Sequence, residues 1–224
     1  MKTVFLKREN TPALRIFFNG WSRDAHCFDG WTSDCDVLEV HDYTELDTAV
    51  FSELLKPYSE LHLAAWSLGV WAAAKVFEKV SVRLDSALAL NGTLVPVHAD
   101  YGIAPEIFDG TIIHWDDLAA RERFLRRMAG TGAAALRLPL PERSPDDQQR
   151  ELAAIRHDAA ESAVPRNIYQ TAAAGKRDRI IPFAAQRNFW QSEPETAFRE
   201  LDLPHYPFDG ITAWEEVFRL GNPG

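Results

Sequence analysis

Short apolar segments rich in β-forming residues recur along the chain and alternate with stretches of helical composition. The strongest segment, residues 13–18 (ALRIFF), ends directly at Asn19-Gly20, a pair typical of a sharp loop. This pattern predicts strands at residues 13–18, 36–41, 60–65, 86–90 and 167–171, and weaker ones at 196–201 and 4–6. It predicts helices at residues 45–55, 70–79, 182–190 and 214–220. The alternation indicates an α/β fold: a mostly parallel sheet with helices on both faces and reactive groups at the carboxyl ends of its strands.

Residues 101–165 break this rhythm, because no clear strand occurs in them. They contain helical runs at 112–128 and 146–161, separated by a segment with three prolines. We therefore predict one core domain made of residues 1–100 and 166–224, with a helical insertion between two of its strands. In a hydrolase such an insertion would be a lid.

Composition and charge narrow the class of protein. The 224 residues are 46% hydrophobic and 25% charged, as in an ordinary globular protein. The net charge of −9 argues against nucleic-acid binding, and the longest uncharged central run, residues 61–74, is too short to cross a bilayer. The charged N-terminal residues do not resemble a secretory signal, so we expect a cytoplasmic protein without a membrane span. Cys27 and Cys35 could form one disulfide, but their spacing does not match a C-x-x-C metal or redox pair. No nucleotide-binding or zinc motif is present, so we expect no cofactor.

The segment from Ala65 to Gly69 (AWSLG) nearly matches G-x-S-x-G, the strained turn that lifts a nucleophilic serine above a sheet. An apolar strand precedes it and a helical run follows it. Ala65 and Gly69 supply the small side chains that this turn needs on either side of Ser67. The alternative is that Ser67 only caps the helix that follows.

A base and an acid should follow the nucleophile in the order Ser, acid, His. His205 alone among the seven histidines lies beyond the fifth predicted strand and its loop, in a segment bracketed by Pro204 and Pro207. Asp178 lies in the turn after that strand, just before a predicted helix. The alternative for Asp178 is a surface carboxylate paired with neighbouring arginines. Order and spacing favour a triad of Ser67, His205 as general base and Asp178 as the residue that orients His205.

Two backbone N–H groups would bind the oxyanion of a reacting ester. One belongs to Leu68, which follows the nucleophile, and the other to Trp21, which follows the Asn19-Gly20 turn. An ordinary Asn-Gly turn is the alternative for this second segment.

Several segments resemble the BioG family of the α/β-hydrolase superfamily: FFNGW (17–21), AWSLGVW (65–71), NGT (91–93), GIAPEIFDGT (102–111), KRDRIIP (176–182) and HYPFDGITAW (205–214). The resemblance covers nearly the whole chain and is weakest over residues 130–162, and Ala65 stands where α/β-hydrolases typically have glycine. BioG proteins are pimeloyl-[acyl-carrier protein] methyl ester esterases of biotin synthesis. The resemblance implies the same triad and oxyanion donors, no cofactor or metal, and hydrolysis of the distal methyl ester to pimeloyl-ACP and methanol.

Acyl carrier proteins are acidic, so an acidic enzyme that binds one needs a local cationic surface. A cluster in the predicted insertion would supply it: Arg121, Arg123, Arg126 and Arg127. A solvated helix face is the alternative. Trp21 and Trp66, beside the predicted chemistry, are expected to contact the acyl chain. Other functions open at this point are a small-molecule carboxylesterase or thioesterase with the same triad, and a non-catalytic binding protein of this fold.

Overall fold

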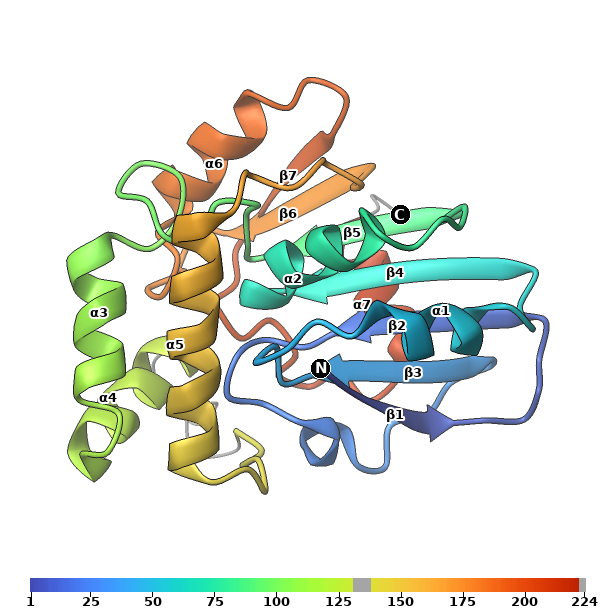
Figure 1. Cartoon of the computed structure of the whole chain (residues 1–224), viewed down its shortest axis with the longest axis horizontal. Helices are drawn as coiled ribbons and strands as arrows, with labels where there is room; N and C mark the ends of the chain where they lie inside the picture. Colours follow the sequence, from blue (N-terminus) through green and yellow to red (C-terminus); the bar gives the residue numbers. More distant parts are fainter. Residues whose placement is uncertain (131–137, 222–224) are drawn as a thin grey trace.

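The computed structural model describes residues 1–130 and 138–221, which form a seven-stranded sheet flanked by helices (Figure 1). The strand order is β1-β3-β2-β4-β5-β6-β7. Strand β1 pairs antiparallel with β3, and the other neighbours pair parallel. The strands are β1 (Lys2–Lys7), β2 (Ala13–Phe18), β3 (Asp36–His41), β4 (Glu60–Trp66), β5 (Ser86–Leu90), β6 (Thr171–Gly175) and β7 (Ala197–Leu201). The predicted mostly parallel α/β sheet is confirmed.

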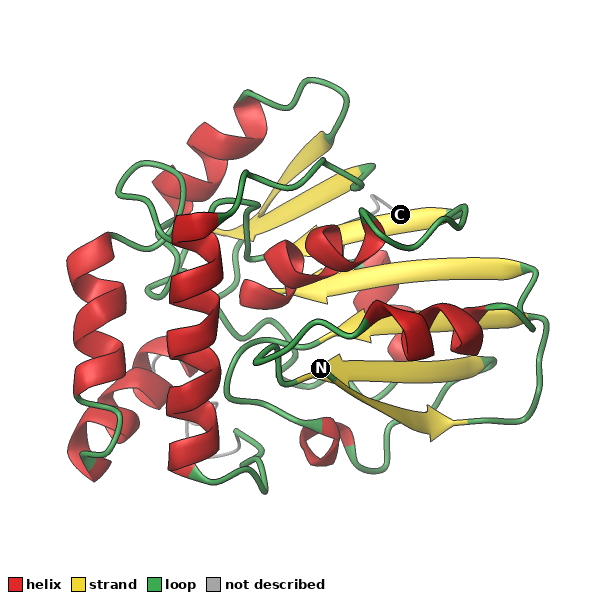
Figure 2. Ribbon diagram, in the orientation of Figure 1, coloured by secondary structure: helices red, strands yellow, loops and turns green. Residues whose placement is uncertain are grey.

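Helices cover both faces of this sheet (Figure 2). Helices α1 (Thr48–Leu55) and α2 (Leu68–Phe77) lie in front of it in Figure 1, whereas α7 (Trp214–Arg219) lies behind it. Helix α6 (Phe183–Gln191) packs against β6 and β7, and a short 3₁₀ helix, η1 (Ala25–Phe28), follows β2. Aromatic side chains fill the space behind the sheet, where the rings of Phe17, Phe28 and Trp214 lie within 5.2 Å of one another. This dry core fixes the ends of the strands on which the site is built.

Three helices separate β5 from β6 in the chain: α3 (Pro105–Ile113), α4 (Leu118–Ala129) and α5 (Pro145–Glu161). They stand beyond the carboxyl ends of the parallel strands (Figure 1). The single helix predicted at residues 112–128 is wrong, because α3 ends at Ile113 and α4 begins at Leu118. Asp117 explains the break, since its side chain accepts a hydrogen bond from the Ala119 N–H and caps a new helix.

The strand predicted at residues 167–171 also differs from its prediction. It corresponds to β6, which spans Thr171–Gly175. Asn167 accepts a hydrogen bond from the Tyr169 N–H and donates to Glu193 and Thr196, so this segment turns before the strand begins. The strand itself is built mainly from buried alanines, although alanine has a low intrinsic preference for strands. Packing against neighbouring strands and helices decides the conformation here more than this intrinsic preference does. In the part of the chain that is described, no helix is long and apolar enough to span a membrane.

Candidate active site

The turn between β4 and α2 presents Ser67 at the carboxyl end of a central strand. Ser67 has φ 59° and ψ −129°, a strained conformation for a residue other than glycine. Its N–H donates to the carbonyl oxygen of Leu90 at 2.9 Å. A Cβ atom at Gly69 would lie 2.4 Å from the carbonyl oxygen of Asn19, so glycine lets α2 begin this close to β2. The Ser67 side chain makes no capping hydrogen bond to α2, which excludes the view that it serves only as a helix cap.

His205 lies in the loop after β7 and is 1% exposed. Its Nε2 atom is 2.9 Å from the hydroxyl oxygen of Ser67, and its Nδ1 atom is 2.7 Å from Oδ2 of Asp178. A carboxylate accepts only, so Nδ1 carries the proton and Nε2 is free to accept from the serine hydroxyl. The ring of Tyr206 follows directly, and burial raises the pKa of its phenol to about 12, so it stays neutral. The structure thus joins the three predicted triad side chains in one buried hydrogen-bonded chain.

Asp178 is held by four hydrogen bonds in the turn between β6 and α6. Its Oδ1 accepts from the N–H groups of Ile180 at 2.8 Å and Ile181 at 3.0 Å. Its Oδ2 accepts from His205 and, at 2.8 Å, from the side-chain nitrogen of Gln186. Asp178 is 7% exposed, so the alternative of a solvated surface carboxylate is wrong. This environment keeps one carboxylate oxygen aimed at the imidazole.

The role of Gln186 was not predicted from the sequence. Its Nε2 donates to both Asp178 and the carbonyl oxygen of Ile181, whereas its Oε1 is buried without a partner among the described residues. In the reversed amide the Oε1 acceptor would face two other acceptors, Asp178 Oδ2 and the Ile181 carbonyl oxygen, so this orientation is the one that chemistry allows. No local sequence pattern signals this contact, because it depends on the burial of Gln186 in the folded structure.

The loop after β2 carries the predicted oxyanion donor Trp21. The Trp21 N–H donates to no group within residues 1–130 and 138–221, and Leu68 is the first residue of α2, where N–H groups lack helical partners. The buried side chain of Asn19 accepts from the Gly20 N–H at 2.9 Å and donates to Glu39 at 2.7 Å. This network anchors the loop to β3. The role of the Trp21 and Leu68 N–H groups as oxyanion donors stays a prediction. Their positions are compatible with that role.

A narrow cavity of about 20 Å³ opens at Ser67, which is room for about one water molecule. Trp21 and Trp66 line it, as predicted for residues near the chemistry. The rest of its wall is mostly apolar: Leu68, Ile103, Phe108, Thr111, Phe124, Met128, Leu152 and Ile180. Helices α3, α4 and α5 all contribute to it, so the insertion forms one side of the cavity.

A larger groove of about 1040 Å³ lies outside this cavity, between α3 and α4. Thr111 and Phe124 line both spaces and therefore form the boundary between them. Of the four arginines in the predicted cluster, Arg123, Arg126 and Arg127 line the groove. Arg121 does not, because its guanidinium donates to two backbone carbonyls of the turn before α4.

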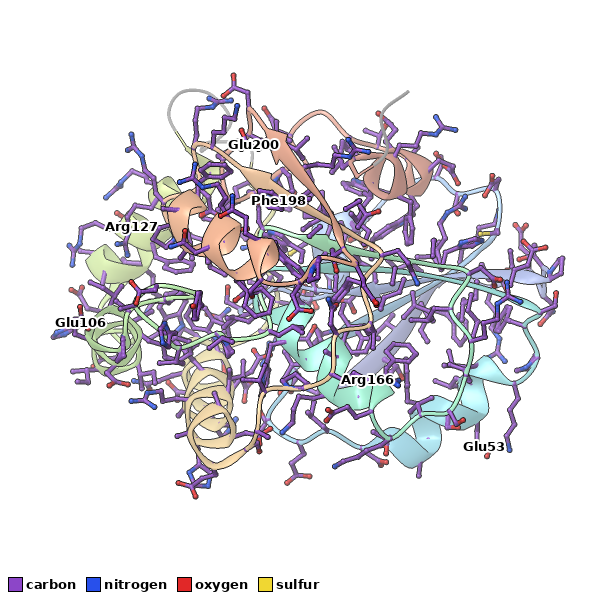
Figure 3. All side chains as sticks on the ribbon, turned by 90° about the horizontal axis from the view of Figure 1, so that it is seen from above. Glu53, Glu106, Arg127, Arg166, Phe198 and Glu200 are labelled. Atoms are coloured by element: carbon purple, nitrogen blue, oxygen red, sulfur yellow. The ribbon has the colours of Figure 1, made fainter. Side chains whose placement is uncertain are left out.

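Another arginine, at position 179, joins this groove from the side of the acid turn. Sequence reasoning treated it only as a neighbour of Asp178. Arg123 is 3.9 Å from Asp117, and Arg126 is 3.6 Å from Glu122, so both are loosely paired and about 60% exposed. Figure 3 shows Arg127 and Glu106 on the helices at this end of the molecule. Among the side chains that the structure describes, no three His, Cys, Asp or Glu gather as a metal site would require.

The sheet order, the covering helices and the serine turn define an α/β-hydrolase. The enol-lactonase of Burkholderia xenovorans LB400 shares this fold, with a TM-score of 0.66 at 14% identity over 98% of this chain and 95% of that one. The chain belongs to the BioG family: residues 1–217 match the family described as pimeloyl-ACP methyl esterase BioG.

Two relatives are similar to the chain. The crystal structure of BioG from Haemophilus influenzae superposes with a TM-score of 0.85 at 30% identity, covering 97% of this chain and 100% of that chain. A malonyl-[acyl-carrier protein] O-methyltransferase from Bacteroides fragilis (strain 638R) is 34% identical over 187 residues. These residues make up 80% of this chain and 38% of that protein, so the chain spans less than half of that relative's length.

Proposed function

We propose that this chain is a serine esterase that hydrolyses the methyl ester of pimeloyl-[acyl-carrier protein] methyl ester and releases pimeloyl-ACP and methanol. The observation that carries the proposal is the hydrogen-bonded chain from Ser67 through His205 to Asp178 at an apolar cavity, in a member of the BioG family. The reaction would place the enzyme in the cytoplasm with its carrier protein.

The mechanism follows from the direction of each hydrogen bond. The hydroxyl of Ser67 attacks the ester carbonyl while Nε2 of His205 takes its proton. Asp178 stabilises the imidazolium and holds the tautomer that this transfer needs. The carbonyl oxygen becomes negative and binds the N–H groups of Trp21 and Leu68. His205 then protonates the departing methoxide, giving methanol, and water repeats the attack on the acyl-enzyme with His205 again as base.

The groove between α3 and α4 supports a route for the substrate. The pimeloyl chain would enter from the groove, pass between Thr111 and Phe124 and bring its distal ester to Ser67. A cavity with room for about one water holds no acyl chain, so Phe124 and its neighbours must move for the substrate to bind. Helices α3, α4 and α5, which belong to the predicted insertion of residues 101–165, would then act as a lid over Ser67.

The acidic carrier protein would dock on the outer rim of the same groove. Arg123, Arg126 and Arg127 provide positive charge there on a chain whose net charge is −9. Arg121 supports the turn that carries them, because its donors are used by the backbone.

The test is mass spectrometry of methyl-pimeloyl-ACP after incubation with the wild-type protein and with Ser67→Ala. We expect loss of the methyl group alone, with the acyl chain still on its carrier, and no change with the variant. A Ser52→Ala variant is the matched control, because Ser52 lies on α1 away from the cavity.

Two outcomes would contradict the proposal. Release of the whole acyl chain would make the protein a thioesterase with the same triad. Demethylation by Ser67→Ala at the wild-type rate would remove Ser67 from the mechanism.

A further inference from the structure

The segment Asn91-Gly92-Thr93 directly after β5 has no part in the mechanism above, yet it lies among the turns that carry the triad. Asn91 is 2% exposed and has φ 46°, in the left-handed region that asparagine tolerates better than most residues. A buried amide in a strained position needs a reason.

All the polar atoms of the Asn91 side chain are used. Its Nδ2 donates to the carbonyl oxygens of Pro204 at 3.0 Å and His205 at 2.8 Å. Its Oδ1 accepts from the N–H of Gly175 at 2.6 Å. Two carbonyls on one side and an N–H on the other leave a single favourable orientation of the amide. The side chain therefore bridges the loop that carries His205 and the end of β6.

The end of β6 leads directly to the acid. The N–H of Asp178 donates to the carbonyl oxygen of Gly175 at 3.0 Å, so Asn91 holds the base of the turn from which the carboxylate projects. Through one amide the imidazole loop and the carboxylate turn share a common support.

The same segment also touches the nucleophile turn. The Ser67 N–H donates to Leu90 O at 2.9 Å, and a Cβ atom at Gly92 would lie 2.3 Å from the Ser67 carbonyl oxygen. Residues 90–92 thus contact all three turns at once. Glycine at 92 allows the nucleophile turn to approach, and asparagine at 91 links the other two.

We infer that Asn91 is a positioning residue for the proposed reaction: its amide sets the spacing between His205 and Asp178. The inference rests on the proposed function. Aspartate at this position would keep the acceptor for Gly175 but would turn a carboxylate oxygen toward two carbonyls. Glycine would keep the backbone conformation and lose all three hydrogen bonds.

The experiment compares Asn91→Gly and Asn91→Asp with wild type on a small soluble ester. Reactive sites are counted with a fluorophosphonate that labels Ser67, so that kcat is expressed per competent molecule. Asn10→Gly is the matched control, because Asn10 also has a left-handed φ, of 61°, but is exposed in the loop between β1 and β2.

We expect kcat per labelled site to fall on the order of 10- to 100-fold in both Asn91 variants with KM little changed, since displaced catalytic groups slow the chemical step. We also expect the acidic limb of the pH profile of kcat/KM to move to lower pH, because a loosened Asp178 stabilises the imidazolium less. Asn10→Gly should match wild type in both respects.

A purely structural role would lower the labelled fraction and leave kcat per labelled site and the pH profile unchanged. That result, or rates within about twofold of wild type, would overturn the inference while the proposed function stands. If Ser67→Ala keeps wild-type turnover of the same ester, the proposed function fails first and the inference falls with it.

Discussion

The edge of the sheet at Ser67 and the helices α3 to α4 differ in how completely their polar groups are bonded. At the sheet edge, Asp178 accepts four hydrogen bonds and the imidazole of His205 makes one at each nitrogen. On the helices, arginines stand about 60% exposed beside a wide groove, and Ile113 and Leu118 are more than 60% exposed. The first region fixes the positions of its side chains, and the second exposes charged and apolar side chains where we propose that the carrier protein docks. Changes in the first should therefore act on kcat, and changes in the second on KM.

The largest effect should come from Asp178→Asn. An asparagine amide can turn its nitrogen toward Nδ1 of His205, which then accepts and leaves Nε2 protonated, so the imidazole is unable to take the proton of Ser67. We expect kcat to fall by about 10⁴-fold with the fold intact. Ester hydrolysis at saturating substrate and thermal melting together measure this.

The control is Asp202→Asn, since Asp202 is exposed and pairs with Arg177 outside the triad. A loss below about tenfold for Asp178→Asn would mean that the carboxylate does little to orient the base.

The sequence was sufficient to predict which three side chains meet at the edge of the sheet, because their positions are encoded locally and in order. A serine between an apolar strand and a helix, followed by one acid turn and one late histidine, defines three positions on an α/β sheet whose geometry is common to the class. The structure brings together Ser67, His205 and Asp178 at hydrogen-bond distance. Each of the three lies at or just after the carboxyl end of a strand.

The supports of these residues were beyond sequence reasoning. Asn91 contacts Gly175, which lies 84 positions further along the chain, and Gln186 contacts Asp178, which lies 8 positions before it. Neither contact follows from the local sequence pattern. The break between α3 and α4 was missed because the apolar spacing continues across residues 113–118, while the cap at Asp117 is a single side chain. Likewise, Arg121 looked like its neighbours, and only the folded turn shows where its donors go.

A smaller effect, of opposite kinetic type, should come from reversing charge in the groove. In Arg123→Glu/Arg127→Glu, we expect KM for the carrier-bound methyl ester to rise about tenfold, because the acidic carrier then meets negative charge. Hydrolysis of a small soluble ester should not change. The comparison is made at two ionic strengths, and salt should narrow the difference.

Arg166→Glu is the matched control, because Arg166 is exposed on another part of the molecule (Figure 3) and does not line the groove. Equal effects on the small and the carrier-bound esters would mean that the arginines support α4 and do not dock a partner.

The smallest effect should come from Asp42, which links the carboxyl end of β3 to α5 through Arg143. Asp42 follows β3 and lies 3.0 Å from Lys2 and 3.5 Å from Arg143, and Arg143 in turn pairs at 2.5 Å with Glu151 on α5. Burial opposes ionisation of Asp42, but hydrogen bonds from Thr44 and Lys2 and the charge of Arg143 outweigh it, so its pKa falls to about 2.

A depressed carboxyl pKa stabilises the fold above the unfolded value, 3.8, and this stability is lost as pH falls toward about 2. After allowance for solvent screening, we assign ionised Asp42 a contribution of about 1 kcal/mol to the free energy of unfolding. Asp42→Asn should therefore lower Tm by roughly 2–4 °C at pH 7, and the difference should shrink as pH falls below about 4. Calorimetry across this range measures the Tm difference, and Glu53→Gln, on an exposed face of α1, should show no such difference.

A Tm difference that stays constant with pH would show that Asp42 acts by packing and not by its charge. A loss of kcat in Asp42→Asn would show that the anchor of α5 also affects the reaction proposed at Ser67.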